Sequence, residues 1–113
     1  MPIKNYKLTF TETAKEDQKN LKKYILKQFK YKKYGESFTA KMKSAYKAIK
    51  TVNNSIDPLK VVYRGYDVYL LPYKTYLFFY IVDESNRVIT LFRVMQNGMD
   101  WMPTILRWIS QNP

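Results

Sequence analysis

The chain contains neither cysteine nor histidine, and both absences restrict its chemistry. Without cysteine there is no disulfide, no thiolate nucleophile and no thiolate-bound metal. Without histidine the Ser-His-Asp arrangement, the commonest general base and the commonest metal ligand are excluded. The nine acidic residues form no convincing metal or glycosidase pair, and the three glycines stand alone rather than in a phosphate-binding loop. We therefore expect neither a metal nor a cofactor.

Long apolar runs are also missing. The longest uncharged apolar stretch, residues 75–82, is far shorter than the roughly 18 residues typical of a membrane span. The first ten residues contain no apolar signal core. With 113 residues, of which 46% are apolar, the chain is expected to form one domain over residues 1–113, in the cytoplasm and without a membrane partner.

Positive charge is abundant and unevenly distributed. Lysine and arginine total 20 against nine acidic residues, so the formal net charge is +11. Residues 1–60 carry 15 lysines and five acids, a net of +10, whereas residues 61–113 carry a net of only +1. This asymmetry favours a polyanionic partner such as nucleic acid, a ribosome or an acidic protein. The alternative is a lysine-rich surface that is simply solvated.

The first part of the chain has the pattern of a strand followed by a helix. Residues 7–10 alternate between polar and apolar side chains, as a half-buried strand does. Apolar residues then recur at helical spacing over 12–31. Thr11 and Thr13 are both candidate N-caps, and Thr13 with Glu16 has the spacing of a capping box.

A second helix is expected to follow. Gly35 is predicted to break the first helical pattern, and Ser37 is predicted to cap the next helix. One apolar stripe runs along residues 37–53. The first half therefore predicts a strand followed by a helical hairpin whose outer faces hold most of the lysines.

The second half changes to strand-like patterns separated by turn signals. Residues 76–82 are apolar on both faces, which is typical of a central strand. The turns expected are a hairpin loop at 83–86 and an Asn-Gly turn at 97–98. The segments predicted are strands at 68–71, 76–82 and 87–95 and a short helix at 101–109, with residues 61–63 either a weak strand or an extended lead-in. The fold class is therefore α+β, in the order β-α-α-β-β-β with a short C-terminal helix, an antiparallel sheet packing against the helical hairpin.

Candidate functional residues are basic or aromatic. Six tyrosines fall between residues 63 and 80, and with Arg64, Lys74 and Arg93 they could stack bases and hold phosphates. The alternative is that tyrosine serves only as a good strand former. Arg93 lies inside an apolar strand, so it must reach solvent, a partner, a site or an internal carboxylate, for which Asp100 and Asp67 are the candidates. The two tryptophans, Trp101 and Trp108, are expected to anchor the core.

The order of several short motifs resembles the RelE/ParE superfamily of bacterial type II toxin–antitoxin toxins along nearly the whole chain. The segment YKLTFTETAKED, residues 6–17, resembles the first strand and the opening of the first helix, and Tyr24-Ile25 resembles the "YI" that follows. The best match is LPYKTYLFFYIVD, residues 71–83. Further matches are Arg93-Val94, Asp100-Trp101 and Ile105-Leu106.

This resemblance implies a toxin held inactive by a cognate acidic antitoxin, with a role such as plasmid stabilization. Some members cleave mRNA on the ribosome, and others poison DNA gyrase. Gln96 stands where the nucleases tend to have His or Tyr, and Tyr69 stands where an Arg is common. RNA cleavage requires a base for the 2′-OH and cations for the phosphorane charge. Because of these departures, the chain has few residues that match the family's catalytic positions.

The catalytic candidates are considered against that family pattern, whereas the target-binding candidates are drawn from the basic residues of the chain. Catalytic candidates are Arg93, Gln96, Arg64 and Tyr69, and target-binding candidates are Lys60, Lys74, Lys19, Lys23 and Lys30. We favour a gyrase-directed or otherwise non-nucleolytic toxin. The alternatives are a metal-independent, ribosome-dependent mRNA endonuclease and a non-toxic, basic nucleic-acid-binding module. The net charge and the apolar, tyrosine-rich sheet predict an antitoxin segment that alternates acidic and apolar residues and folds on binding.

Overall fold

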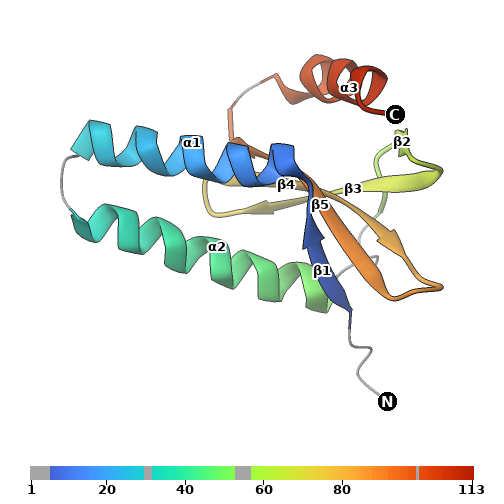
Figure 1. Cartoon of the computed structure of the whole chain (residues 1–113), viewed down its shortest axis with the longest axis horizontal. Coiled ribbons are helices and arrows are strands. Elements are labelled where there is room, and N and C mark those ends of the chain that lie inside the picture. Colours follow the sequence, from blue (N-terminus) through green and yellow to red (C-terminus); the bar gives the residue numbers. More distant parts are fainter. Residues whose placement is uncertain (1–5, 30–31, 53–56, 99) are drawn as a thin grey trace.

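The structure is a computed structural model that describes residues 6–29, 32–52, 57–98 and 100–113. The chain folds into an α+β domain of two long helices, a five-stranded sheet and a C-terminal helix (Figure 1). The elements are β1 (Lys7–Phe10), α1 (Glu12–Phe29), α2 (Lys32–Val52), β2 (Val62–Tyr63), β3 (Tyr66–Tyr73), β4 (Tyr76–Asp83), β5 (Val88–Gln96) and α3 (Trp101–Gln111). The predicted order of elements is confirmed.

The sheet is mixed rather than purely antiparallel. Its strand order is β1-β5-β4-β3-β2, with antiparallel pairing from β2 to β5 and parallel pairing between β1 and β5. The four later strands follow one another through tight turns, which makes them antiparallel. The first strand is instead connected through the two helices to β2 at the opposite edge of the sheet, so no tight turn joins it to its neighbour β5, and this pair is parallel.

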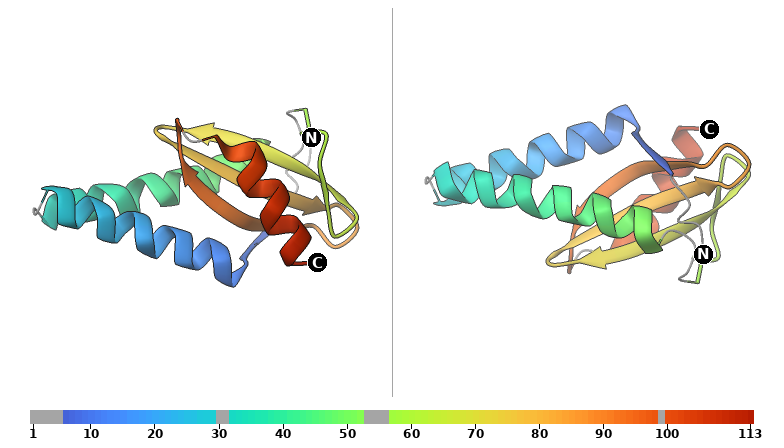
Figure 2. Two further views of the ribbon diagram at one scale, coloured as in Figure 1. Left: turned by 90° about the horizontal axis from the view of Figure 1, so that it is seen from above. Right: turned by 90° about the horizontal axis from the view of Figure 1, so that it is seen from below.

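Helices cover the sheet on both faces (Figure 2). The α1–α2 hairpin packs over one face around Phe78 and Leu91, and α3 packs over the other around Phe79 and Phe92. Strand β4 lies in the middle of the sheet, and its residues from Tyr76 to Val82 are all buried. This explains why the β4 segment is apolar on both faces, and Trp101 and Trp108 pack against the α3 side as expected.

The start of α1 resolves the choice between the two candidate caps. Thr11 is the N-cap, because its Oγ1 accepts a hydrogen bond from the Ala14 backbone N–H at 3.1 Å. Thr13 already lies inside the helix, so the capping box predicted between Thr13 and Glu16 is wrong. The predicted end at residue 31 lies outside the described residues.

The second helix begins earlier than the sequence pattern indicated. It runs through both Gly35 and Ser37, so neither residue breaks or caps a helix. A Cβ atom on Gly35 would lie 2.9 Å from Leu26 Cδ2, so glycine allows the two helices to approach closely there. A tertiary contact therefore accounts for a residue that usually weakens helices by about 1 kcal/mol.

Candidate functional site

Arg93 is held by a carboxylate from the first helix. Its Nε lies 2.8 Å from Asp17 Oδ2 and its Nη2 lies 3.1 Å from Asp17 Oδ1, which is a bidentate ion pair. The same Asp17 Oδ2 accepts the backbone N–H of Val94 at 3.0 Å. Only 18% of the Arg93 side chain and 14% of the Asp17 side chain are exposed. The arginine side chain is therefore paired within the protein, which was one of the alternatives, but its partner is Asp17 and not either candidate carboxylate, Asp100 or Asp67.

The local fold explains why the pair forms. Strand β1 ends at Phe10, so the next part of β5 has no neighbouring strand on that edge. Side chains from the start of α1 replace the missing strand: Thr11 Oγ1 donates to the Phe92 carbonyl at 3.0 Å, and Asp17 accepts from Val94. These bonds satisfy edge groups that would otherwise be unpaired.

A bulge in β5 then places the arginine. Phe79 pairs with Arg93, but the next pair is Tyr80 with Leu91, so Phe92 is an extra residue in β5. Phe92 is buried in the core under α3, and Arg93 reaches the carboxylate on α1. The bulge thus accommodates a charged residue within an otherwise apolar strand.

Asp17 was missed as a site residue by the sequence reasoning. It appeared only as the last residue of the family-like segment 6–17. The available signal was its spacing three residues after Ala14, which is fully buried, since residues three apart share one helix face. Burial raises the pKa of Asp17 above its usual value, although the Arg93 guanidinium and the Val94 N–H oppose that shift.

The structure brings only some of the predicted catalytic residues together. Arg93 and Gln96 line one hollow of about 290 Å³ between α1, β5 and α3. Arg64 lies in the β2–β3 turn, at the end of β3 that is far from that hollow. Tyr69 packs on the face of the sheet that the α1–α2 hairpin covers. Tyr69 stacks on Tyr80 with ring centroids 5.6 Å apart. The four candidates therefore form no single cluster around one reacting phosphate.

The tyrosines between residues 63 and 80 are mostly part of the core. Tyr63, Tyr76 and Tyr80 are buried, with relative exposures of 1%, 6% and 0%. Tyr69 and Tyr73 are partly buried against the same core cluster as Tyr76 and Tyr80. Burial raises the pKa of Tyr80, which matches its position in the core. Base stacking by this group is not supported, because only Tyr66 exposes much of its ring.

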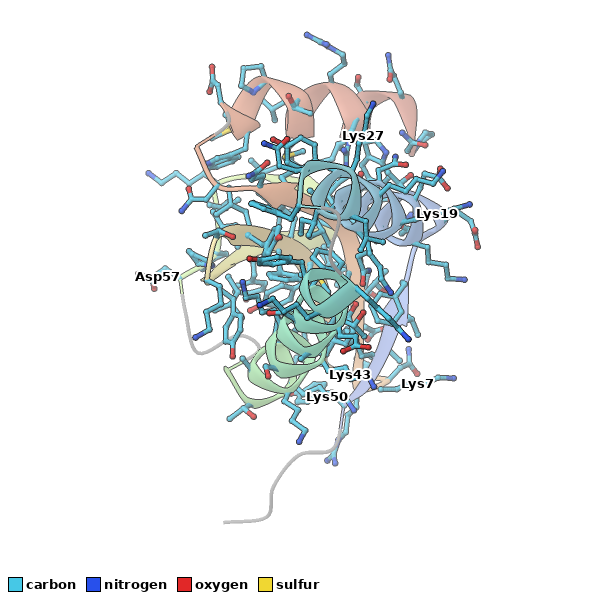
Figure 3. The ribbon with its side chains drawn as sticks, turned by 90° about the vertical axis from the view of Figure 1, so that its left-hand side faces the viewer. Lys7, Lys19, Lys27, Lys43, Lys50 and Asp57 are labelled. Atoms are coloured by element: carbon cyan, nitrogen blue, oxygen red, sulfur yellow. The ribbon has the colours of Figure 1, made fainter. Side chains whose placement is uncertain are left out.

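The predicted target-binding lysines are dispersed. Lys19 and Lys23 are exposed on α1, Lys60 is exposed before β2, and Lys74 lies in the β3–β4 turn with its Nζ 5.8 Å from the Tyr73 ring centroid. Lys30 lies outside the described residues. Figure 3 looks onto the hairpin end, where the labelled lysines Lys19, Lys27, Lys43 and Lys50 extend outward from both helices. The positive charge therefore surrounds the hairpin rather than forming one patch.

A groove runs from the free end of the hairpin, which extends past the sheet (Figure 1), along α1 to the hollow that Arg93 lines. It consists of two hollows, of about 380 Å³ and 290 Å³, that share Leu21, Tyr24 and Gln96. We call this the hairpin groove. Tyr24 is 54% exposed and Phe29 is 48% exposed, and the Phe29 ring lies 4.8 Å from that of Tyr34. Large apolar side chains thus line an open surface, and the sequence reasoning did not single it out.

Two features are absent from the described residues. Nowhere in residues 6–29, 32–52, 57–98 and 100–113 do three or more acidic side chains gather as a metal ion would require. Within the same ranges, none of the helices is both long and apolar enough to span a membrane.

The arrangement matches that of known toxins. The model of the family described as "ParE toxin of type II toxin-antitoxin system, parDE" matches residues 8–101. The chain therefore belongs to the ParE toxin family, within the RelE/ParE superfamily. No curated protein matches the sequence closely.

Solved structures show the same fold at low sequence identity. The chromosomal ParDE toxin–antitoxin system of P. aeruginosa aligns with a TM-score of 0.65 and 15% identity, covering 82% of this chain and 97% of that one. A RelBE toxin–antitoxin complex from Mycobacterium tuberculosis aligns at 0.57 with 17% identity, covering 82% and 99%. The archaeal RelE–RelB complex from Pyrococcus horikoshii aligns at 0.53 with 15% identity, covering 83% and 97%.

Proposed function

We propose that this ParE-family toxin inhibits growth without cleaving RNA, with DNA gyrase as its expected target, and that a cognate acidic antitoxin neutralises it. The observation that carries the mechanism is the Arg93–Asp17 pair. A guanidinium that stabilises a transition state must be free to meet the charge that develops on the substrate. Here the Nε and Nη2 groups of Arg93 are both bonded to one carboxylate of the same chain.

The rest of the nuclease set supports the same conclusion. A general base must lie within hydrogen-bond reach of the proton that it abstracts. Gln96 has no titratable group, and Tyr69 is partly buried under the helices with its pKa raised by burial. Arg64 is at the other end of β3. Of the predicted catalytic residues, only Gln96 therefore lines the same hollow as Arg93, and its amide cannot act as a base.

Primer extension on mRNA from cells that express the toxin tests this mechanism. We expect growth arrest with uncut mRNA. Codon-phased cuts would instead support ribosome-dependent cleavage, provided that they disappear in Asp17→Asn/Arg93→Gln. That double variant removes both charges together, so it avoids leaving one buried charge unpaired.

The hairpin groove is the surface that best fits the antitoxin. The sheet itself is not available, because α1–α2 and α3 cover its two faces. The groove instead has exposed Tyr24 and Phe29, and residues 18–52 around it carry 11 lysines and a single acid. Such a surface is complementary to an amphipathic segment with apolar residues on one face and acidic residues at its margins. The proposal therefore places the predicted acidic and apolar antitoxin segment on the hairpin rather than on a face of the sheet.

Calorimetry with the acidic protein encoded beside this gene tests the assignment. Tyr24→Ser/Phe29→Ser is expected to weaken binding about a hundredfold, since burying one large apolar side chain contributes roughly 1.5–3 kcal/mol. The matched control is Met102→Ser/Leu106→Ser on α3, where the exposed fractions are 40% and 48%. Equal losses in both variants would place the antitoxin elsewhere. Undetectable binding to the unmodified toxin at micromolar concentration would contradict the partner itself.

A further inference from the structure

A separate polar hollow of about 480 Å³ lies where the start of α1, the β2–β3 turn and the end of α3 meet. We call it the threonine hollow, because four hydroxyl side chains from three elements line it. They are Thr9, Thr11, Thr13 and Thr90. Arg64 and Trp108 also line it, and none of its residues belongs to the hairpin groove. Of its lining residues only Arg64 is among the predicted catalytic candidates, and the proposed function assigns no role to any of them.

Arg64 provides a cation without an internal counterion. Its side chain is exposed, and its Cζ lies 4.9 Å from the centroid of the Tyr63 ring, so the guanidinium is stacked on an aromatic face. Among the described residues, no carboxylate lies within ion-pair distance of this guanidinium. Its planar fork of N–H donors is therefore available to an external anion, and the stacking restricts its orientation.

Further donors face the same hollow. Thr13 Oγ1 accepts the indole N–H of Trp108 at 3.2 Å, and no described residue accepts its own hydroxyl proton. Thr11 caps the Ala14 N–H of the 18-residue helix α1, which leaves the earlier first-turn N–H groups for another acceptor. Glu12 also lines the hollow, but its carboxylate is 91% exposed and lies 3.2 Å from Lys15 Nζ, so a lysine compensates its charge.

A buried residue next to Arg64 also lines the hollow. The Tyr63 side chain is only 1% exposed, and its hydroxyl is the buried side-chain polar atom that lacks a hydrogen-bond partner among the described residues. Buried hydroxyls are nearly always bonded, and exceptions occur where a water, ion or ligand completes the site. Tyr63 lines the hollow and its ring contacts the Arg64 guanidinium, while its hydroxyl is buried.

We propose that the threonine hollow binds a phosphate group. Arg64 would contact two phosphate oxygens through its fork, while the Thr13 hydroxyl and the first-turn N–H groups of α1 would donate to the others. The hollow lies away from the Arg93–Asp17 pair, so binding there requires no cleavage chemistry. It also does not depend on the antitoxin, because no residue of the hairpin groove takes part.

Titration of the purified toxin with inorganic phosphate, at constant ionic strength and followed by amide NMR shifts, tests the proposal. We expect shifts around Thr13 and Arg64, and Arg64→Gln should weaken binding about tenfold, as the loss of charge-assisted bonds predicts. The matched control is Lys74→Gln. Lys74 is also a turn cation with positive φ (57°, against 53° for Arg64) and lies over the adjacent tyrosine, but it is outside the hollow.

Two further comparisons distinguish specific phosphate binding from an effect of surface charge. Thr13→Val should weaken binding with no change in charge, whereas Thr13→Ser should retain it. A 5′-phosphorylated dinucleotide compared with an unphosphorylated one distinguishes a terminal phosphate from a backbone diester. Equal losses in Arg64→Gln and Lys74→Gln, or shifts that sodium chloride reproduces, would reduce the effect to general surface charge and overturn the proposal.

Discussion

Removing the Asp17 carboxylate should reveal how strongly the Arg93 pair stabilises the fold. In Asp17→Ala the guanidinium loses both of its bonds and the Val94 N–H loses its acceptor, while Arg93 remains only 18% exposed. Removing one partner of a fully buried ion pair costs about 3–5 kcal/mol. Because these side chains retain some exposure, we expect about 3 kcal/mol, at the lower end of that range. Urea unfolding followed by circular dichroism measures this difference.

A surface pair on the same helix provides the control. Glu12 and Lys15 lie 3.2 Å apart, but their side chains are 91% and 59% exposed, so Glu12→Ala should cost no more than about 1 kcal/mol. The double variant Asp17→Ala/Arg93→Met should recover part of the stability lost in Asp17→Ala, since no unpaired charge remains. This reasoning would be refuted if Asp17→Ala lowered the free energy of unfolding by less than Glu12→Ala does. It would also be refuted if the loss in the double variant equalled the sum of the losses in Asp17→Ala and Arg93→Met.

Three other perturbations have defined outcomes. Thr11→Ala removes both the α1 cap and the bond to the Phe92 carbonyl, and should lower the free energy of unfolding in urea by about 1–2 kcal/mol. Thr11→Ser keeps the hydroxyl and should retain most of that stability. Burial raises the pKa of Tyr46 to about 12, so the folded state holds this proton more tightly than the unfolded state does. Stability should therefore fall as the pH rises above about 10. Tyr46→Phe should reduce that fall, and an unchanged dependence of stability on pH in this variant would contradict the prediction. Lys19→Glu/Lys23→Glu should lower the salt dependence of antitoxin binding with little effect on folding, and an identical slope would make these lysines solvated surface only.

The elements that depend on local pattern were predictable from the sequence. The β4 segment is apolar at every position because it lies between two covered faces, and the Asn97-Gly98 turn follows from its own residues, with Gly98 at a φ of 98°. The same local signals, taken in order, indicated the family. The lysine-rich hairpin was also evident from its helical spacing and composition.

The features that depend on distant contacts were not predictable. The Arg93–Asp17 pair joins residues 76 positions apart, and its geometry depends on a bulge and on the end of β1. Gly35 lies within a helix because Leu26 of the other helix packs against it. The parallel pairing of β1 likewise follows from the crossover and not from its four residues. For the same reason, the hairpin groove and the threonine hollow became visible only once the elements were placed.

The measurement that tests the proposed mechanism most directly is DNA supercoiling by purified gyrase in the presence of the purified toxin. We expect the toxin to block supercoiling, the antitoxin to restore it, and Asp17→Asn/Arg93→Gln to inhibit as well as the unmodified toxin, since the ion pair has a structural role. Normal supercoiling at toxin concentrations that arrest growth, together with mRNA cuts that depend on Arg93, would contradict the account.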